Sequence, residues 1–406
     1  MFEPKIFKIP KTDNSQSNGF ISSSNVIPSA TINYQLISLG FQTYMHKTKD
    51  TLLAITSGLK TQNKFYYVVN EFEHEISNYK DSLDESTIKY LNLKELPQGV
   101  RPYYKIWEML YGFSLIPSVD FSYMGISLNP QIINFSVESF KNKLVNEKSK
   151  TKSFDIKING NGKPLQFIEH IKKATHTCDL VIADGSYDVF SNESSPSYNF
   201  QEQESYSLLL GQVALGLKTQ NKNGSMIIKL FESYTLPTIK IVYLLSYFYE
   251  ELYIYKPYMS RTSNPEKYII CKNFNPNKNI VLQKLINNIE NIITESSKNF
   301  IFDIFPSVKI PQEYLKLFRY VNIKLANELQ IVANDIIVYI KENNYFGDKY
   351  HTYRNKQISA SNWWRTTFYP PSNNLYKEQT LEIQKLYKQY YEKHLLEENN
   401  LSDKLS

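Results

Sequence analysis

Short apolar runs alternate with helical segments between residues 120 and 275, and this alternation limits what the chain can fold into. Runs such as "FSYMGISL", "CDLVIADGS" and "GSMIIKLF" are continuously apolar, as is typical of strands buried on both faces of a parallel sheet. The segments between them, such as "SYSLLLGQVALGLKTQ", are typical of helices. We therefore predict an α/β, Rossmann-like sheet with helices on both faces. The last two runs, "ELYIYKP" and "EKYIICKNF", predict an antiparallel hairpin at one edge of the sheet.

The two flanks of this region differ from it in composition. Residues 1 to about 35 are rich in Ser, Asn, Pro and Thr, which predicts an extended arm that could dock on a partner. After residue 276, apolar residues recur at i, i+3 and i+4, which predicts a helical C-terminal extension whose wide apolar stripe favours core packing over a partner interface. The stretch "NWWRTTFYPP" at 362–371 is interpreted as a loop with exposed aromatics. The predicted division is a lead-in region (1–95), a sheet domain (96–275) and a helical extension (276–406).

Composition sets further bounds. The hydrophobic content of 42% supports a real core, and the net charge of +6 permits an anionic partner without requiring one. Cys178 and Cys271 lie in apolar sequence, which favours a reducing compartment such as the cytoplasm. The six histidines show no metal-ligand spacing, so no metal site is predicted. The most apolar stretch is interrupted by Lys240, Glu250 and Glu251, so no membrane span is predicted.

Four charged residues stand out by their positions. Asp184 ends a predicted buried strand, where sites form in doubly wound sheets, although capping of the next turn explains it equally well. Lys229 ends another apolar strand and must reach either water or a carboxylate. Lys105 lies in an amphipathic segment, and Glu266 precedes the last predicted strand. The chain order is Lys, Asp, Lys, Glu.

The segments that carry these residues resemble, in order, the motifs of the FtsJ-like family of RNA ribose 2′-O-methyltransferases, which includes cap-specific enzymes of large DNA viruses. The matching stretches are "VRPYYKIWE", "DLVIADGS", "GQVALGLKTQNKNGSMIIK" and "SRTSNPEKY". Four motifs in the family's order are far more specific than any one alone. The resemblance covers residues 99 to 274.

The resemblance implies S-adenosylmethionine as cofactor and RNA as substrate, with capped mRNA as the expected target. It implies that Lys229 contacts and activates the ribose 2′-hydroxyl, that Asp184 and Glu266 tune and orient Lys229, and that Lys105 helps to place the ribose. An ammonium between carboxylates normally has a raised pKa, so burial or Lys105 must offset this effect if Lys229 is to act as a base. RNA is expected to contact Arg101, Tyr103, Tyr104, Arg261 and Ser263; ordinary packing or a solvated charge explains the first three equally well.

One family feature has no counterpart in the sequence. The family's first strand leads into an "A-P-G-G-F"-type loop, whose glycines let the backbone approach the cofactor. No such loop stands between Lys105 and Gly125, and "FSYMGISLNP" is interpreted as the family's second strand, with about one strand and one helix absent.

Three explanations stay open for this departure. The segment is missing from the sequence, the cofactor is held differently, or cofactor binding has been lost. In the second case the candidate cofactor residues lie in "GISLNP", "KINGNGKPL" and the end of the Asp184 strand, with turn formation as the alternative for the asparagines. They are Ser127, Asn129, Asn159, Asn161 and Asp184. The third case gives the alternative function: a catalytically inactive methyltransferase-fold subunit that binds RNA or a capping or transcription partner through the N-terminal arm or the C-terminal helices.

Overall fold

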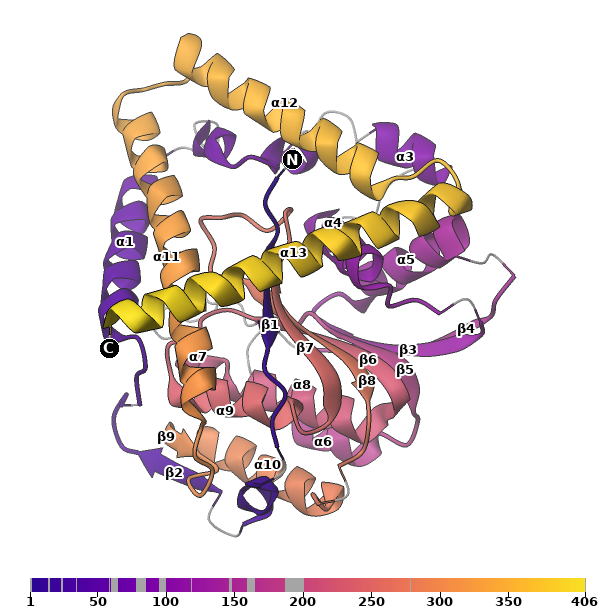
Figure 1. Cartoon of the computed structure of the whole chain (residues 1–406), viewed down its shortest axis with the longest axis vertical. Coiled ribbons are helices and arrows are strands. Elements are labelled where there is room, and N and C mark those ends of the chain that lie inside the picture. Colours follow the sequence, from indigo (N-terminus) through magenta and orange to yellow (C-terminus); the bar gives the residue numbers. More distant parts are fainter. Residues whose placement is uncertain are drawn as a thin grey trace.

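A seven-stranded mixed sheet forms the centre of the computed structural model, with the strand order β1-β7-β8-β6-β5-β3-β4 (Figure 1). Strands β4, β3, β5 and β6 are parallel, whereas β8 is antiparallel to both β6 and β7, and β1 is antiparallel to β7. The structure describes residues 2–405 except 14, 23–24, 34, 58, 60–64, 78–84, 95–99, 118, 146–147, 159–164, 187–200 and 278. The predicted α/β sheet with flanking helices is confirmed.

The elements have the following bounds. The strands are β1 (Lys5–Ile9), β2 (Val26–Ser29), β3 (Phe121–Ser127), β4 (Thr151–Lys157), β5 (Cys178–Ala183), β6 (Gln220–Leu230), β7 (Tyr249–Lys256), β8 (Lys267–Phe274) and β9 (Phe300–Ile304). The α-helices are α1 (Leu39–Ser57), α2 (Glu73–Ser77), α3 (Glu85–Leu91), α4 (Val100–Phe113), α5 (Pro130–Phe140), α6 (Gln166–Lys173), α7 (Gln201–Glu204), α8 (Tyr206–Thr219), α9 (Leu236–Leu245), α10 (Leu282–Ser296), α11 (Gln312–Lys341), α12 (Asp348–Phe368) and α13 (Asn373–Leu405). Short helical turns are η1 (Ser17–Ile21), η3 (Phe65–Val69) and η5 (Lys141–Val145).

Two hydrophobic cores lie on opposite faces of the sheet, because successive side chains of a strand alternate between its faces. On β5, Val181 and Ala183 face the core built with α6, α8, α9 and α10. Leu180 and Ile182 face the other core, built with α4, α5, α12 and α13. Both faces of the sheet are covered, which explains why its strands read as continuous apolar runs.

The N-terminal residues are part of this sheet, so the prediction of a free arm at residues 1–35 is wrong for this stretch. Strand β1 pairs with β7, with Lys5 opposite Lys256 and Ile9 opposite Leu252. The β7–β8 hairpin is antiparallel as predicted, but it does not lie at the edge, because β1 covers β7. A second small sheet joins β2 to β9, a strand that the sequence did not predict in the C-terminal region.

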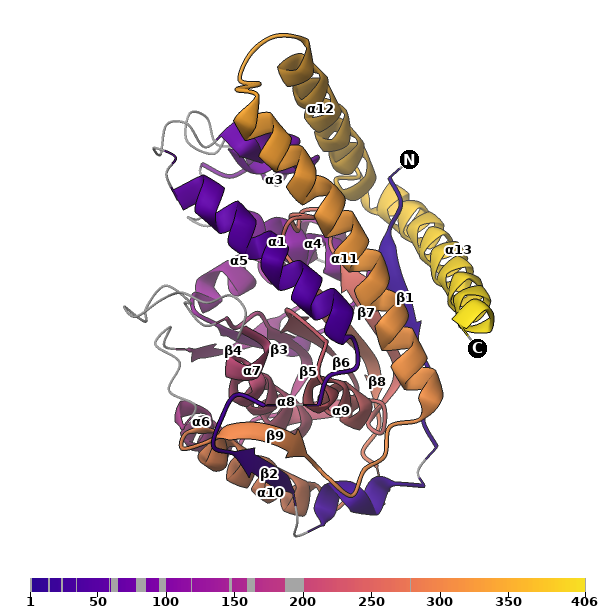
Figure 2. The ribbon, with the colours of Figure 1, turned by 90° about the vertical axis from the view of Figure 1, so that its left-hand side faces the viewer.

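The C-terminal extension packs on the sheet domain. Helix α13 crosses over β1 (Figure 1), and α11 lies beside α1 (Figure 2). The loop predicted at 362–371 is wrong, since α12 continues to Phe368. Trp364 is fully buried because its ring packs on Tyr104 and Phe368, so it is not an exposed aromatic. Among the described residues, no helix has the length and hydropathy needed to cross a membrane.

Removal of residues 277–406 should leave an insoluble fragment. The deletion uncovers the faces of α8 and β1 that α10 and α13 bury, together with Trp107 and Tyr104, which pack on α12 and the residues just after it. Large exposed apolar patches drive aggregation. Sedimentation after expression and a thermal melt monitored by circular dichroism would measure this outcome. A soluble fragment that melts cooperatively would contradict it.

Candidate active site

The four predicted charged residues meet at one edge of the sheet because of strand parity and direction. Asp184 continues the face of Leu180 and Ile182, and Lys229 shares the face of Ile227. Since β8 runs antiparallel to β6, Glu266 at the start of β8 lies at the same edge as Lys229 at the end of β6. Helix α4 covers this face and supplies Lys105.

Their contacts form a continuous chain of buried ion pairs. The Lys229 Nζ lies 2.6 Å from Asp184 Oδ1 and 3.8 Å from Glu266 Oε2, while the Lys105 Nζ lies 2.7 Å from Glu266 Oε1. Each of the four side chains is at most 10% exposed. Two ammonium groups and two carboxylates balance, so the edge of the sheet buries no net charge.

The environment separates the two lysines. Burial lowers the pKa of Lys229, but attraction to Asp184 and Glu266 outweighs burial, so the pKa lies above its ordinary value. Burial lowers the pKa of Lys105 below its ordinary value in spite of Glu266. The offset that Lys229 needs to act as a base is therefore not met, and Lys229 rests as an ammonium. Its chemistry is that of a charged hydrogen-bond donor.

Two further side chains position the carboxylates, and the sequence analysis missed both. The Tyr268 hydroxyl donates to Asp184 Oδ1 at 2.8 Å, and the Ser260 hydroxyl donates to Glu266 Oε1 at 3.3 Å. Tyr268 could have been found from strand parity, because it lies two residues after Glu266 and on the same face.

The sheet order corrects the interpretation of "FSYMGISLNP". Strand β3 is the first of the parallel strands in the chain, and β4 and β5 fill both of its sides. No gap remains there for an absent strand, so the prediction that β3 is a second strand is wrong. The chain continues from β3 to β4 on one side and then crosses to β5 on the other, which makes the carboxyl ends of β3 and β5 the switch point where ligands bind in such sheets.

The place of the glycine-rich loop is therefore the connection from β3 to α5, where the sequence is Leu128–Asn129. The nearby Gly125 lies inside β3, where an added Cβ would stand 3.3 Å from Ile133 Cγ2, so this glycine serves the packing of α5. Across the switch point, Asp184 supplies a buried carboxylate suited to a sulfonium cation, and backbone N–H groups at the start of α5 suit an anion. The described residues thus offer the charges that S-adenosylmethionine requires, without the glycine loop.

The other predicted cofactor residues have mixed outcomes. Ser127 is buried at the end of β3, and its hydroxyl oxygen accepts a hydrogen bond from the Asn129 backbone N–H at 3.3 Å. Asn129 is exposed at the N-terminus of α5. Asn159 and Asn161 lie outside the described residues.

The predicted RNA contacts of Tyr103 and Tyr104 are wrong. Both rings are fully buried in the core under α12 and α5, where Tyr103 packs on Phe135 and Tyr104 packs on Trp364, so neither can stack on a base. Arg101, Arg261 and Ser263 line cavities at the surface. Within the described part of the chain, no group of three or more His, Cys, Asp or Glu residues could hold a metal ion.

Comparison with known proteins agrees with the resemblance seen in the motifs. The FtsJ-like methyltransferase family model matches residues 112–274, which is less than half of the chain. The resemblance to this family is confirmed for that segment.

Individual relatives match over limited stretches. Cap-specific mRNA (nucleoside-2′-O-)-methyltransferase 2 of Drosophila melanogaster is 26% identical over 50% of this chain and 27% of its own length. Probable methyltransferase EP424R of African swine fever virus is 39% identical over 26% of this chain and 24% of its own. The cap-specific mRNA (nucleoside-2′-O-)-methyltransferase of Autographa californica nuclear polyhedrosis virus is 35% identical over 25% of this chain and 37% of its own. The match thus spans well under two thirds of each relative.

Among solved structures, human methyltransferase-like protein 13 in complex with SAH aligns over 51% of this chain and 96% of its own length. The identity is 12% and the TM-score 0.24, a likeness too weak to carry an argument.

The ion pairs of Glu266 should make stability depend on acid pH. Burial raises the pKa of Glu266, but Lys105 and Lys229 outweigh burial and hold the pKa at about 2, below its ordinary value of 4.5. A carboxylate with a depressed pKa stabilises the fold above its unfolded pKa, and this contribution is lost as pH falls through the folded pKa. The difference in unfolding free energy between wild type and Glu266→Gln should therefore shrink as pH falls from 4.5 towards 2. Urea titrations at several pH values would measure it, and a difference independent of pH would contradict it.

Proposed function

We propose that this chain is an S-adenosylmethionine-dependent RNA ribose 2′-O-methyltransferase that acts at the mRNA cap. The observation that carries the proposal is the meeting of Lys105, Asp184, Lys229 and Glu266 at the carboxyl edge of the sheet. The printed names of the cap-specific relatives support the same substrate class.

In this proposal Lys229 acts on the ribose hydroxyl as an ammonium. Its Nζ donates a hydrogen bond to the 2′-oxygen, orients that oxygen for in-line attack and stabilises the negative charge that develops on it. Asp184 and Glu266 fix the Nζ from two sides, so little reorganisation is needed. When bound, S-adenosylmethionine supplies a methyl group activated by a sulfonium.

The hydroxyl proton must also leave the reacting oxygen. Lys229 is already protonated and cannot accept it. Lys105 is the better acceptor, because burial lowers its pKa and increases the fraction of neutral amine at neutral pH. The two lysines then have separate roles, with Lys229 as donor to the oxygen and Lys105 as the base.

Replacement of Lys229 should abolish methyl transfer. Lys229→Met keeps the length of the side chain but removes the charge and the donor, and loss of such a group lowers rates by roughly 100-fold or more. The measurement is transfer of label from S-adenosylmethionine to the ribose of capped RNA. Lys173→Met, at a largely exposed lysine on α6, is the control and should keep full activity. Wild-type labelling no higher than that of Lys229→Ala would refute the proposed activity.

A second candidate function rests on the β3–α5 connection, which has no glycine. In this candidate the chain keeps the fold, binds no cofactor and serves as a subunit that binds RNA or a capping or transcription partner. The N-terminal route to such a partner is reduced, because β1 is taken up by the sheet. The outer face of α13 remains for it, with Leu381, Leu395 and Leu396 exposed. For either function we propose the reducing cytoplasm as location, in keeping with two free, buried cysteines.

Calorimetry separates the two functions. We expect the full chain to bind S-adenosylmethionine and S-adenosylhomocysteine with micromolar affinity, because Asp184 supplies the counter-charge at the switch point. Asp184→Asn should weaken the binding of the sulfonium compound more than that of the neutral thioether. Absence of heat with both compounds would favour the inactive subunit.

A further inference from the structure

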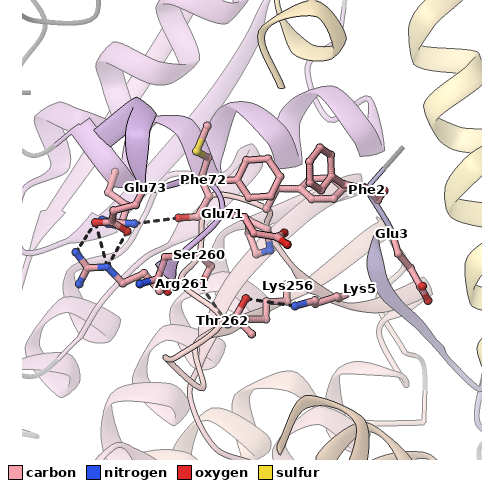
Figure 3. Close-up of a pocket in the computed structure, with 15 residues that line it drawn as sticks. Phe2, Glu3, Lys5, Glu71, Phe72, Glu73, Lys256, Ser260, Arg261 and Thr262 are labelled. Carbon is pink, nitrogen blue, oxygen red and sulfur yellow. Dashed lines mark hydrogen bonds and ion pairs between the residues drawn. The ribbon is translucent and has the colours of Figure 1, made fainter. Parts of the chain in front are cut away.

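A surface cavity of about 300 Å³ lies beside the candidate active site (Figure 3). Its lining comes from the start of the chain, from residues 70–73, from α4 and from the β7–β8 connection. Ser260 belongs both to this lining and to the active site, since its hydroxyl donates to Glu266. The segment 70–73 lies outside the stretch that matches the family model.

Two arginines of the lining share one buried carboxylate. Glu73 accepts from Arg101 Nη2 at 2.5 Å, from Arg261 Nη2 at 2.7 Å and from Arg261 Nε at 3.0 Å (Figure 3 shows Arg261 and Glu73). The Glu73 side chain is 3% exposed, whereas those of Arg101 and Arg261 are 22% and 31% exposed. Two guanidinium groups on one carboxylate leave one positive charge uncompensated at the cavity.

Further contacts fix both arginines. The Arg261 guanidinium stacks on the Tyr67 ring at 4.1 Å, and Arg101 Nη1 donates to the Met259 carbonyl oxygen at 3.3 Å. Arginines held in this way lose little side-chain entropy when they bind an anion. The carboxylate of Glu73 therefore serves as a pin for a preformed cationic pair.

A buried donor without a partner lines the same cavity. Asn70 is 5% exposed, and its Oδ1 accepts from the Ser263 hydroxyl at 3.4 Å. Its Nδ2 has no hydrogen-bond partner among the described residues. Leaving such a donor unpaired in the folded protein costs about 1–3 kcal/mol. A ligand with acceptor oxygens would satisfy it.

The position of the pair relative to the active site defines the kind of ligand. Arg101 precedes Lys105 by four residues on α4, which is about one helical turn. Arg261 precedes Glu266 by five residues in the β7–β8 connection. A monoanion between the arginines would thus lie next to a ribose held at Lys105 and Lys229.

We propose that Arg101, Arg261 and Asn70, pinned by Glu73, form a site for one phosphodiester group of the RNA strand next to the methylated ribose. This inference rests on the proposed function for the identity of the RNA. In it Glu73 is a positioning residue and not a competitor of the RNA. The two roles of Glu73 predict opposite signs for its replacement.

The test is binding of a fluorescein-labelled single-stranded RNA to the full chain, without cofactor, followed by fluorescence anisotropy at several salt concentrations. Glu73→Asp keeps the charge but is too short to reach both guanidinium groups, and we expect it to weaken binding about threefold or more. Asn70→Asp replaces the donor by an acceptor, and we expect about tenfold weaker binding. The salt slope should fall by about 0.7, as for one lost phosphate contact on a single strand. Asn287→Asp adds the same charge at an exposed position of α10 and should change the affinity less than twofold.

Thermal melts accompany each variant, and Arg101→Lys, which keeps the charge and loses the fork geometry, replaces Glu73→Asp if that variant unfolds. Tighter binding by Glu73→Asp would overturn the proposal in favour of an internal competitor, and unchanged binding by Asn70→Asp would overturn it as well. The outcome is separate from that of the methyl-transfer assay. Binding that responds as expected in a chain without activity would refute only the proposed enzyme, whereas activity with unresponsive binding would refute only this site.

Discussion

Compensation of buried charge is the constraint on which this structure depends. Taking an ion out of water costs several kcal/mol even after relaxation, and removal of one partner of a buried pair leaves that cost uncompensated. Lys105, Asp184, Lys229 and Glu266 meet this constraint only when α4 lies on the sheet in one register, because Lys105 is the single member that does not come from the sheet region. The position of α4 is therefore decisive for the site.

A second buried carboxylate holds α4 in that position. Glu108, one turn after Lys105 on this helix, accepts from the backbone N–H groups of Tyr258 and Met259 at 2.8 and 3.0 Å. It also accepts from Trp364 Nε1 at 2.8 Å, and the Trp107 indole donates to the Phe368 carbonyl oxygen. Helix α12 of the C-terminal extension thus closes over α4 and over the β7–β8 connection. The extension helps to build the active-site edge, although it lies outside the stretch that matches the family model.

The sequence was informative where structure depends on local pattern. The six strands β3 to β8 were predictable, because each is a continuous apolar run buried on both faces. Strands β1, β2 and β9 were not, since they are four or five residues long and pair with partners more than 240 residues away in the chain. The helix through Trp363 and Trp364 was mistaken for a loop, because two Pro residues follow it and its aromatic face is buried only by tertiary contacts. The candidate site residues were found through ordered motifs, but their pKa directions and the pin at Glu73 depend on packing that no local pattern contains.

The pairing of β1 with β7 has a consequence for how the protein is made. Lys5 leaves the ribosome about 250 residues before Lys256, its neighbour in the sheet, and α13, which covers β1, is translated last. At about 5–20 residues per second, the first strand waits on the order of ten to fifty seconds for its partner. During this time the apolar residues Ile6, Phe7 and Ile9 have no sheet to join, although all three end in the core. A cell that makes this protein must therefore shield an unpaired N-terminal strand until synthesis is nearly complete.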